Sequence, residues 1–168
     1  MNAVIIAVLM QTLVHMTAPT PGAPTEQRHL EAKLFDATRN AQDDVDAALE
    51  RAQAGNKTVV VVMGANWCHD SIGLAGWFET SRFVPMMRDR YELVYVDVGT
   101  PQTGRGLNLD ISKRFGIKKV KSTPLVMLVS ADGKLLNSKK DAASWRNAAS
   151  RSEQAVFDYF DGFTPDQK

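Results

Sequence analysis

The only cysteine of the chain, Cys68, lies in a short run of residues that could do chemistry, Trp67-Cys68-His69-Asp70-Ser71. A thiol attacks a disulfide only as the thiolate, and a free cysteine with a pKa of about 8.5 is mostly protonated at neutral pH. The unpaired amides of a helix N-terminus stabilise the anion, and the Ser71 hydroxyl could donate a hydrogen bond to the sulfur. A protonated His69 would favour the thiolate, whereas Asp70 would disfavour it. The run therefore indicates a catalytic cysteine with Ser71 as its hydrogen-bond partner.

Other chemistries fit this run less well. Consecutive residues at a helix start project in different directions, so Cys68, His69 and Asp70 would not line up as a hydrolase triad. Two adjacent ligands rarely hold one metal ion, and the other histidines lie near the N-terminus at positions 15 and 29, so no metal site is predicted. The remaining alternative is an inert buried cysteine, against which the polar neighbours argue.

The surrounding sequence predicts the elements of an α/β domain. The unbroken β-branched run 58–63 is typical of a strand buried on both faces of a sheet, and a helix is expected to begin near Cys68. Apolar residues at helical spacing before the strand predict a helix that Asp43 and Asp44 cap and Gly55 ends. The other expectations are helices over 82–90, 110–115 and 144–160, a strand over 92–98, a loop over 99–106, and a hairpin of 125–129 with 134–137.

A second feature, Thr123-Pro124, stands directly before the expected hairpin. Together with Trp67-Cys68 at a strand-to-helix junction, it resembles the thioredoxin fold over about residues 40–140. In that family a Trp-Cys-x-x-Cys begins a helix, and an x-Pro bond, usually cis, faces it across the site. The resemblance implies an α/β thioredoxin-like fold, with a central mixed β-sheet flanked by helices. Ser71 stands where the family has its second cysteine.

The missing second cysteine changes the chemistry that the resemblance implies. Cys68 could form a mixed disulfide, but release would need an external thiol or the substrate's own second cysteine. The buried acid that thioredoxins carry six residues before the first cysteine, where it aids deprotonation of the second, corresponds here to Val62. The expected activity is therefore monothiol thiol–disulfide exchange, in the form of isomerisation, deglutathionylation or thiol capture rather than net reduction.

The resemblance also implies partners and substrate contacts. Trp67 and His69 are expected to shape the substrate site around Cys68, and the backbone of Thr123 and Pro124 to pair with an extended substrate segment. The expected partners are cysteine-containing proteins or glutathione, the latter as a co-substrate, with no other cofactor. The alternative function is a non-catalytic binding or chaperone-like module in which Cys68 has no turnover role.

The charge balance limits other partners. Twenty Lys and Arg against nineteen Asp and Glu leave a net charge of +1, which argues against a nucleic-acid partner. One local cluster is basic: Lys113, Arg114, Lys118, Lys119 and Lys121. Such clusters are commonly solvated faces. In the thioredoxin-like arrangement this one leads to the Thr123-Pro124 loop, so it could also recruit an acidic partner or the carboxylates of glutathione.

Residues 1–24 contain no Lys, Arg, Asp or Glu and open with an apolar run that ends in a proline-rich stretch. This composition indicates a secretory signal peptide with a spacer, and hence a periplasmic or secreted protein, with a cytoplasmic protein as the alternative. The apolar run is shorter than the ~20 residues that cross a bilayer as a helix, so membrane contact is expected only through an uncleaved leader. We expect an N-terminal extension over 25–39 and the thioredoxin-like domain over 40–168.

Overall fold

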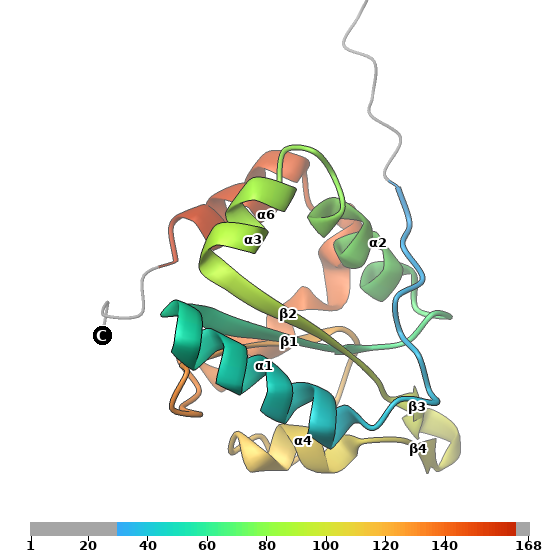
Figure 1. Cartoon of the computed structure of the whole chain (residues 1–168). Helices are drawn as coiled ribbons and strands as arrows, with labels where there is room; N and C mark the ends of the chain where they lie inside the picture. Colours follow the sequence, from blue (N-terminus) through green and yellow to red (C-terminus); the bar gives the residue numbers. More distant parts are fainter. Residues whose placement is uncertain (1–29, 164–168) are drawn as a thin grey trace, which may run out of the picture.

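A three-stranded sheet in the order β2-β1-β5 lies at the centre of the molecule (Figure 1). The structure is a computed structural model and describes residues 30–163. β1 (Thr58–Gly64) pairs in parallel with β2 (Tyr91–Asp97) and antiparallel with β5 (Leu125–Val129). The sheet is therefore mixed, as the sequence predicts.

The residues of β1 explain why this strand is central. All seven are buried, because the strand has neighbours on both edges and packed side chains on both faces. Val60 and Val62 belong to one apolar cluster, whereas Val59, Val61 and Met63 belong to the other. Successive side chains of a strand point to opposite faces, so a continuous apolar run serves both clusters at once. The prediction of a strand buried on both faces is confirmed.

Helices cover both faces of the sheet (Figure 1). On one face lie α1 (Ala41–Gly55) and α4 (Leu109–Arg114). On the other face lie α2 (His69–Phe78), α3 (Val84–Arg90) and α6 (Glu153–Asp161). This arrangement confirms the predicted fold class. Within residues 30–163, none of the helices has both the length and the apolar character needed to cross a bilayer.

The N-terminus of α1 differs from the sequence prediction. Asn40 is the N-cap, and its side-chain oxygen accepts hydrogen bonds from the amides of Gln42 and Asp43. Asp43 and Asp44 lie inside the first turn, where a negative charge suits the positive end of the helix dipole. The expectation that these two acids cap the helix is therefore wrong, because an asparagine one position before the helix takes that role.

The segment predicted as a loop over 99–106 contains a small hairpin. β3 (Gly99–Thr100) pairs antiparallel with β4 (Arg105–Gly106), and the short 3-10 helix η1 (Pro101–Thr103) connects them. Gly99 and Gly104 have positive φ, a backbone conformation that glycine adopts without steric cost. These two glycines allow the chain to turn back on itself directly after β2.

The second strand of the hairpin expected over 134–137 does not form. The returning segment makes an isolated β-bridge between Val129 and Leu135, with backbone hydrogen bonds from the Ser130 amide to the Lys134 carbonyl at 2.9 Å and from the Leu136 amide to the Leu128 carbonyl at 2.7 Å. The side chain of Asn137 then bonds to β5 itself: its oxygen accepts from the Leu128 amide, and its nitrogen donates to the Val126 carbonyl, each at 3.0 Å. The predicted turn therefore forms and the chain returns antiparallel to β5, but 134–137 pairs through a few bonds and the Asn137 side chain, and only the prediction of a regular second strand is wrong.

The single amphipathic helix expected over 144–160 is divided. α5 (Lys139–Ala142) continues into the 3-10 helix η2 (Ala143–Ser150), and α6 begins separately. Asn147 has non-helical angles within η2, with φ −126° and ψ 29°. Ser152 then caps α6, since its hydroxyl accepts from the amide of Ala155. A serine that bonds the following backbone starts a new helix instead of continuing the previous one, so the prediction of one helix is wrong.

Residues 30–36, which we call the N-terminal strap, run beside α2 (Figure 1). The amide of Ala32 donates to the carbonyl of Ile72 at 3.0 Å. The carbonyl oxygen of Leu30 lies so close to Gly76 that a Cβ at this position would be 1.4 Å from it. Gly76 is therefore required by the close approach of two backbones. Part of the segment expected as an extension thus contacts the domain.

Replacing Gly76 with alanine should displace the N-terminal strap from α2. We expect the free energy of unfolding to fall by about 1–3 kcal/mol through overpacking, which exceeds the gain of ~0.5–1 kcal/mol in helix propensity. Urea unfolding measures the stability, and hydrogen exchange at the Ala32 amide measures release of the strap. Gly55→Ala is the matched control, because its Cβ would meet the flexible Lys57 side chain at 3.3 Å. Equal effects of the two substitutions would contradict this account of Gly76.

Candidate active site

Cys68 lies where the chain passes from the central strand into α2. Its amide donates to the carbonyl of Ala65 at 3.0 Å, which closes a tight turn after β1. Cys68 is the N-cap of α2, with an extended backbone, and its carbonyl accepts from the amides of Ser71 and Ile72, each at 3.0 Å. The residue that carries the thiol therefore stands at the N-terminal end of the helix, where the partial positive charge of the backbone favours an anion.

The loop before β5 provides the contacts of the sulfur. The Thr123-Pro124 peptide bond is cis. The hydroxyl of Thr123 donates to Cys68 Sγ at 3.1 Å, and the thiol donates to the Thr123 carbonyl at 3.5 Å. Cys68 is 9% exposed and Thr123 is 8% exposed, so water has little access to this contact. The contact with the carbonyl uses the thiol proton, whereas the Thr123 hydroxyl supplies its own proton to the sulfur.

Ser71 does not make the hydrogen bond that the sequence analysis assigned to it. Its hydroxyl is fully buried and has no hydrogen-bond partner among the described residues. It lies against the end of β1, since a Cβ at Gly64 would be 2.5 Å from Ser71 Oγ. The hydroxyl donor to the sulfur is Thr123 instead. The sequence does place Thr123 near Cys68, because it directly precedes the proline expected to face the cysteine. The prediction, however, gave a role only to the Thr123 backbone and none to its hydroxyl.

The exposed neighbours of Cys68 form an open rim. Trp67 is 52% exposed, and its indole nitrogen donates to the Gly99 carbonyl at 2.9 Å. This bond links the rim to the β3–β4 hairpin. His69 is exposed, and its Nδ1 lies 2.8 Å from Oε1 of Glu31 in the N-terminal strap. Both residues expected to shape the substrate site therefore flank the cysteine at the surface.

Asp70 is held on the other side of the turn. Its carboxylate accepts a hydrogen bond from the Ala149 amide of η2 at 2.9 Å. The sequence analysis treated Asp70 as a charge that opposes the thiolate. In the structure it also fastens the first turn of α2 to η2, a role that no local pattern indicates because the partners are 79 residues apart.

The N-terminal strap contributes a second support that the sequence analysis did not include. Asn66 donates to the Phe35 carbonyl at 2.7 Å and accepts from the Phe35 amide at 3.1 Å. The Phe35 ring packs edge-on against Tyr95, with ring centroids 5.6 Å apart. Burial raises the pKa of Tyr95 well above its usual range. The turn that precedes Cys68 is thus fixed by a two-way hydrogen bond to the strap.

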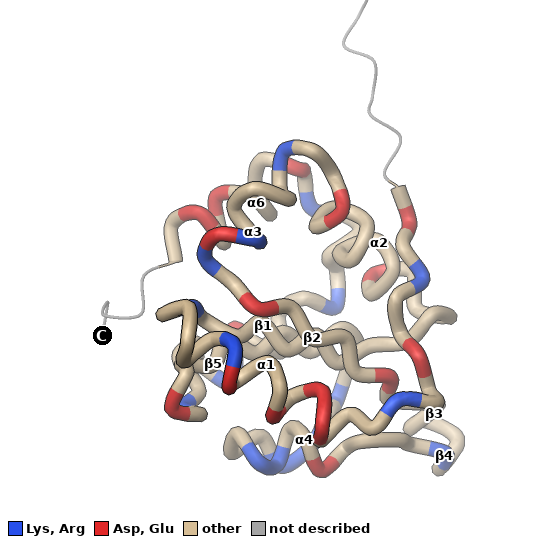
Figure 2. The backbone as a smooth tube through the Cα atoms, viewed as in Figure 1, with Lys and Arg blue, Asp and Glu red and all other residues tan. Residues whose placement is uncertain are grey.

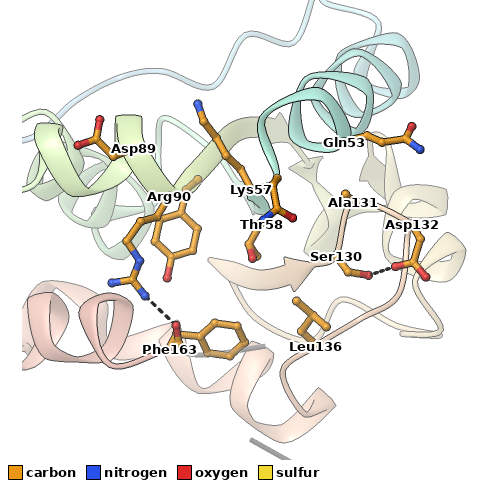
Figure 3. Close-up of a pocket in the computed structure, with 12 residues that line it drawn as sticks. Gln53, Lys57, Thr58, Asp89, Arg90, Ser130, Ala131, Asp132, Leu136 and Phe163 are labelled. Atoms are coloured by element: carbon orange, nitrogen blue, oxygen red, sulfur yellow. Dashed lines mark hydrogen bonds between the residues drawn. The ribbon is translucent and has the colours of Figure 1, made fainter. Parts of the chain in front are cut away.

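A large pocket lies away from the cysteine (Figure 3). Its volume is about 640 Å³, and its lining includes Thr58 at the start of β1, whereas Cys68 follows the end of that strand. Its cations are already engaged: Lys57 pairs with Glu92 at 2.8 Å, and Arg90 donates to the Phe163 carbonyl at 2.8 Å. Neither Cys68 nor Thr123 lines this pocket, so it is separate from the cysteine site.

A cysteine at the start of the helix that follows a central strand, opposite a cis-proline loop, is the arrangement expected of thioredoxin-like proteins. A family model described as thioredoxin-like matches residues 40–131, which is more than half of the chain. The chain belongs to this family.

The solved structures similar to this chain include the following two. A disulphide isomerase from Xylella fastidiosa Temecula1 has 28% sequence identity and a TM-score of 0.68, covering 77% of this chain and 95% of that one. A protein of unknown function from Pseudomonas aeruginosa has 15% identity and a TM-score of 0.40, covering 79% of this chain and 91% of that one, and adds nothing to the assignment. No curated protein matches the sequence.

Replacing Thr123 with valine should slow the reaction of Cys68 with iodoacetamide at pH 7 by about 3- to 10-fold. A hydrogen bond to a charged group contributes about 1.5–3 kcal/mol, and the lower thiolate fraction is partly offset by higher intrinsic nucleophilicity. Thr123→Ser keeps the hydroxyl and should stay within about twofold of the wild type by the same reasoning. Equal rates for the valine and serine variants would contradict the role of Thr123 Oγ1.

Proposed function

We propose that this protein catalyses thiol–disulfide exchange with a single nucleophilic cysteine. The observation that carries the proposal is the position of Cys68 Sγ, at the N-cap of α2 and 3.1 Å from the Thr123 hydroxyl. Helix amides and a hydroxyl donor both favour a thiolate, which is the species that attacks disulfides. The similarity to a disulphide isomerase supports the same activity for this chain.

The first step is attack by the Cys68 thiolate on one sulfur of a substrate disulfide. A bond forms between Cys68 Sγ and that sulfur, while the substrate's own S–S bond breaks and its second sulfur leaves as a thiolate. The product is a mixed disulfide at Cys68 plus one free substrate thiolate. No net oxidation or reduction has occurred, so this step needs no external oxidant or reductant.

Release of the substrate follows from the residue at position 71. Ser71 cannot attack the mixed disulfide as a second cysteine would. Release from a substrate mixed disulfide therefore needs a thiolate of the substrate itself, which gives isomerisation. With a glutathionylated protein, Cys68 attacks the glutathione sulfur and the protein leaves as a free thiolate. A second glutathione then attacks the glutathione bound to Cys68, which frees the Cys68 thiolate and gives glutathione disulfide as the by-product. Val62, buried beneath the site, provides no acid or base, and a site without a resolving thiol does not require one.

The Thr123-Pro124 loop is the proposed binding edge for the substrate chain. The Thr123 amide has no hydrogen-bond partner among residues 30–163. An extended segment that adds to this edge would give that amide an acceptor and align its disulfide with Cys68 Sγ. Exposed Trp67 and His69 would then contact the substrate on the opposite side of the sulfur. Cysteine-containing proteins and glutathione remain the proposed partners.

We propose a periplasmic or secreted location for this activity. The support is the composition of residues 1–24, which lie outside the described residues. Disulfides form and persist in such compartments, so substrates with wrongly paired cysteines occur there.

The proposed activity is tested with a protein whose disulfides have been scrambled, incubated in a glutathione buffer. The wild type should accelerate recovery of the native disulfides, and Cys68→Ser should not. The wild type should show little net reduction of insulin. Recovery that is equally fast with Cys68→Ser would show that the protein acts as a chaperone-like module without thiol turnover, and would contradict the proposal.

Ser71→Cys is the companion variant in this experiment. The Cys68 carbonyl accepts from the amide of residue 71 at 3.0 Å, so the two backbones are close together. A cysteine at position 71 whose side chain turns from Gly64 toward Cys68 should therefore come within disulfide reach of Cys68 and confer insulin reduction. Ala54→Cys, on the exposed side of α1, adds a thiol elsewhere and should confer none. Absence of both an internal disulfide and reductase activity in Ser71→Cys would show that the proposed site geometry is wrong.

A further inference from the structure

Five exposed lysines surround a groove beside the loop that contacts the sulfur. We call it the lysine groove, and its lysines are Lys118, Lys119, Lys121, Lys139 and Lys140. The groove has a volume of about 560 Å³ and lies between the segment that follows α4 and the helix α5. Figure 2 shows Lys and Arg positions gathered in and after α4. Lys139 and Lys140 of α5 add to the cluster from a more distant part of the sequence.

These positive charges are not neutralised by the described part of the protein. None of the five lysines forms an ion pair within residues 30–163, and no Asp or Glu lines the groove. Arg114 of the same basic cluster, in contrast, pairs with Asp46 at 2.6 Å. Asp141 is next to Lys140 in sequence, but its carboxylate accepts from the Tyr159 hydroxyl. Unpaired like charges repel one another, so the groove is suited to bind an anion.

The floor of the groove is apolar. Ile117 and Leu125 line it and are 7% and 2% exposed, and Ala143 lies half-buried beside them. An inorganic anion gains nothing from apolar surface. A peptide offers carboxylates together with aliphatic side-chain carbons, so lysines above an apolar floor favour a peptide as the ligand.

The groove is continuous with the proposed substrate edge. Lys121 precedes Thr123 by two residues, a distance that the chain spans in at most about 7 Å. Leu125 follows Pro124 directly and is the first residue of β5. Groove residues therefore stand on both sides of the loop whose Thr123 hydroxyl contacts the sulfur. A chain that leaves the cysteine site along this loop would enter the groove.

We propose that the lysine groove binds an acidic segment of the substrate protein, adjacent to the cysteine that exchanges with Cys68. This inference rests on the proposed function and names a substrate class for it: proteins with several Asp or Glu residues beside a reactive disulfide. The groove attracts the acidic segment, and the Thr123-Pro124 loop aligns the disulfide with the thiolate. The selectivity is therefore electrostatic and falls as salt screens the charges.

The test measures the rate of mixed-disulfide formation at Cys68 with two peptides. Each carries one cysteine activated as a thiopyridyl disulfide, flanked in one peptide by four glutamates and in the other by four glutamines. At low ionic strength the wild type should react about tenfold faster with the glutamate peptide, from several ion pairs that each contribute modestly. The preference should nearly vanish at about 1 M salt, where the screening length is only ~3 Å.

Two triple variants with the same change in net charge test whether the preference for the glutamate peptide comes from the lysine groove. The groove variant combines Lys121→Gln, Lys139→Gln and Lys140→Gln. The control combines three exposed cations from elsewhere: Arg88→Gln, Lys134→Gln and Arg146→Gln. The groove variant should lose the preference for the glutamate peptide, and the control should keep most of it. Equal preference in the two variants would overturn the proposal, because it would show a long-range effect of net charge.

Additional measurements distinguish failure of the groove proposal from failure of the proposed function, and binding of an acidic peptide from binding of other polyanions. If wild type reacts with both peptides at one rate, the groove proposal is overturned while exchange at Cys68 stands. If neither peptide reacts although neutral dipyridyl disulfide does, the proposed function itself fails. An unreactive glutamate peptide should compete with its activated form. A DNA oligonucleotide of equal charge that competes as well would show a general polyanion site and overturn the choice of an acidic peptide.

Discussion

The contact between Cys68 Sγ and Thr123 is the interaction on which the site depends. It joins two segments 55 residues apart, and the register of the sheet makes it possible. β1 and β5 are antiparallel, and Met63 pairs with Leu125. The end of β1 therefore meets the start of β5, so the chain leaving toward Cys68 and the chain arriving from Thr123 emerge at the same edge. The thiol and its hydroxyl donor are positioned by backbone pairing several residues away.

The packing behind this contact leaves little room for movement. Gly64 ends β1 between Ser71 and Phe35, and a Cβ there would lie within 2.8 Å of both side chains. Asn66 ties the following turn to Phe35 through two hydrogen bonds, while Asp70 ties the first turn of α2 to η2. The helix N-terminus is thus held from both sides. Hydrogen-bond donors that are already held in position can stabilise a developing charge without the cost of rearrangement.

The parts of the fold and site that could be predicted are those with strong local signals. The run 58–63 has to be a strand, since β-branched residues fit poorly in a helix and its burial on both faces demands a central position. The helix expected to begin near Cys68 does so, with Cys68 as its N-cap. The family resemblance supplied the loop opposite, which no local pattern links to a residue so distant in sequence.

The errors arise where a side-chain hydrogen bond or a packing contact, local or tertiary, overrides the apolar periodicity of the sequence. Asn137 bonds to β5 through its side chain and replaces an expected strand, and Ser152 caps a new helix inside an apparently continuous pattern. Ser71 has the residue type of a donor but faces β1, whereas Thr123 reaches the sulfur. A glycine within a helix, such as Gly76, has no local explanation, and its role follows from the close approach of the N-terminal strap.

The central claim is that one cysteine completes a cycle of exchange, and mass spectrometry of the intact protein tests it most directly. The protein is mixed with a glutathionylated peptide, and glutathione is added after a delay. The account predicts that glutathione first transfers to Cys68 with release of the reduced peptide, and that added glutathione then restores the free thiol. A peptide that loses its glutathione without any adduct at Cys68, or an adduct that added glutathione does not remove, would contradict it.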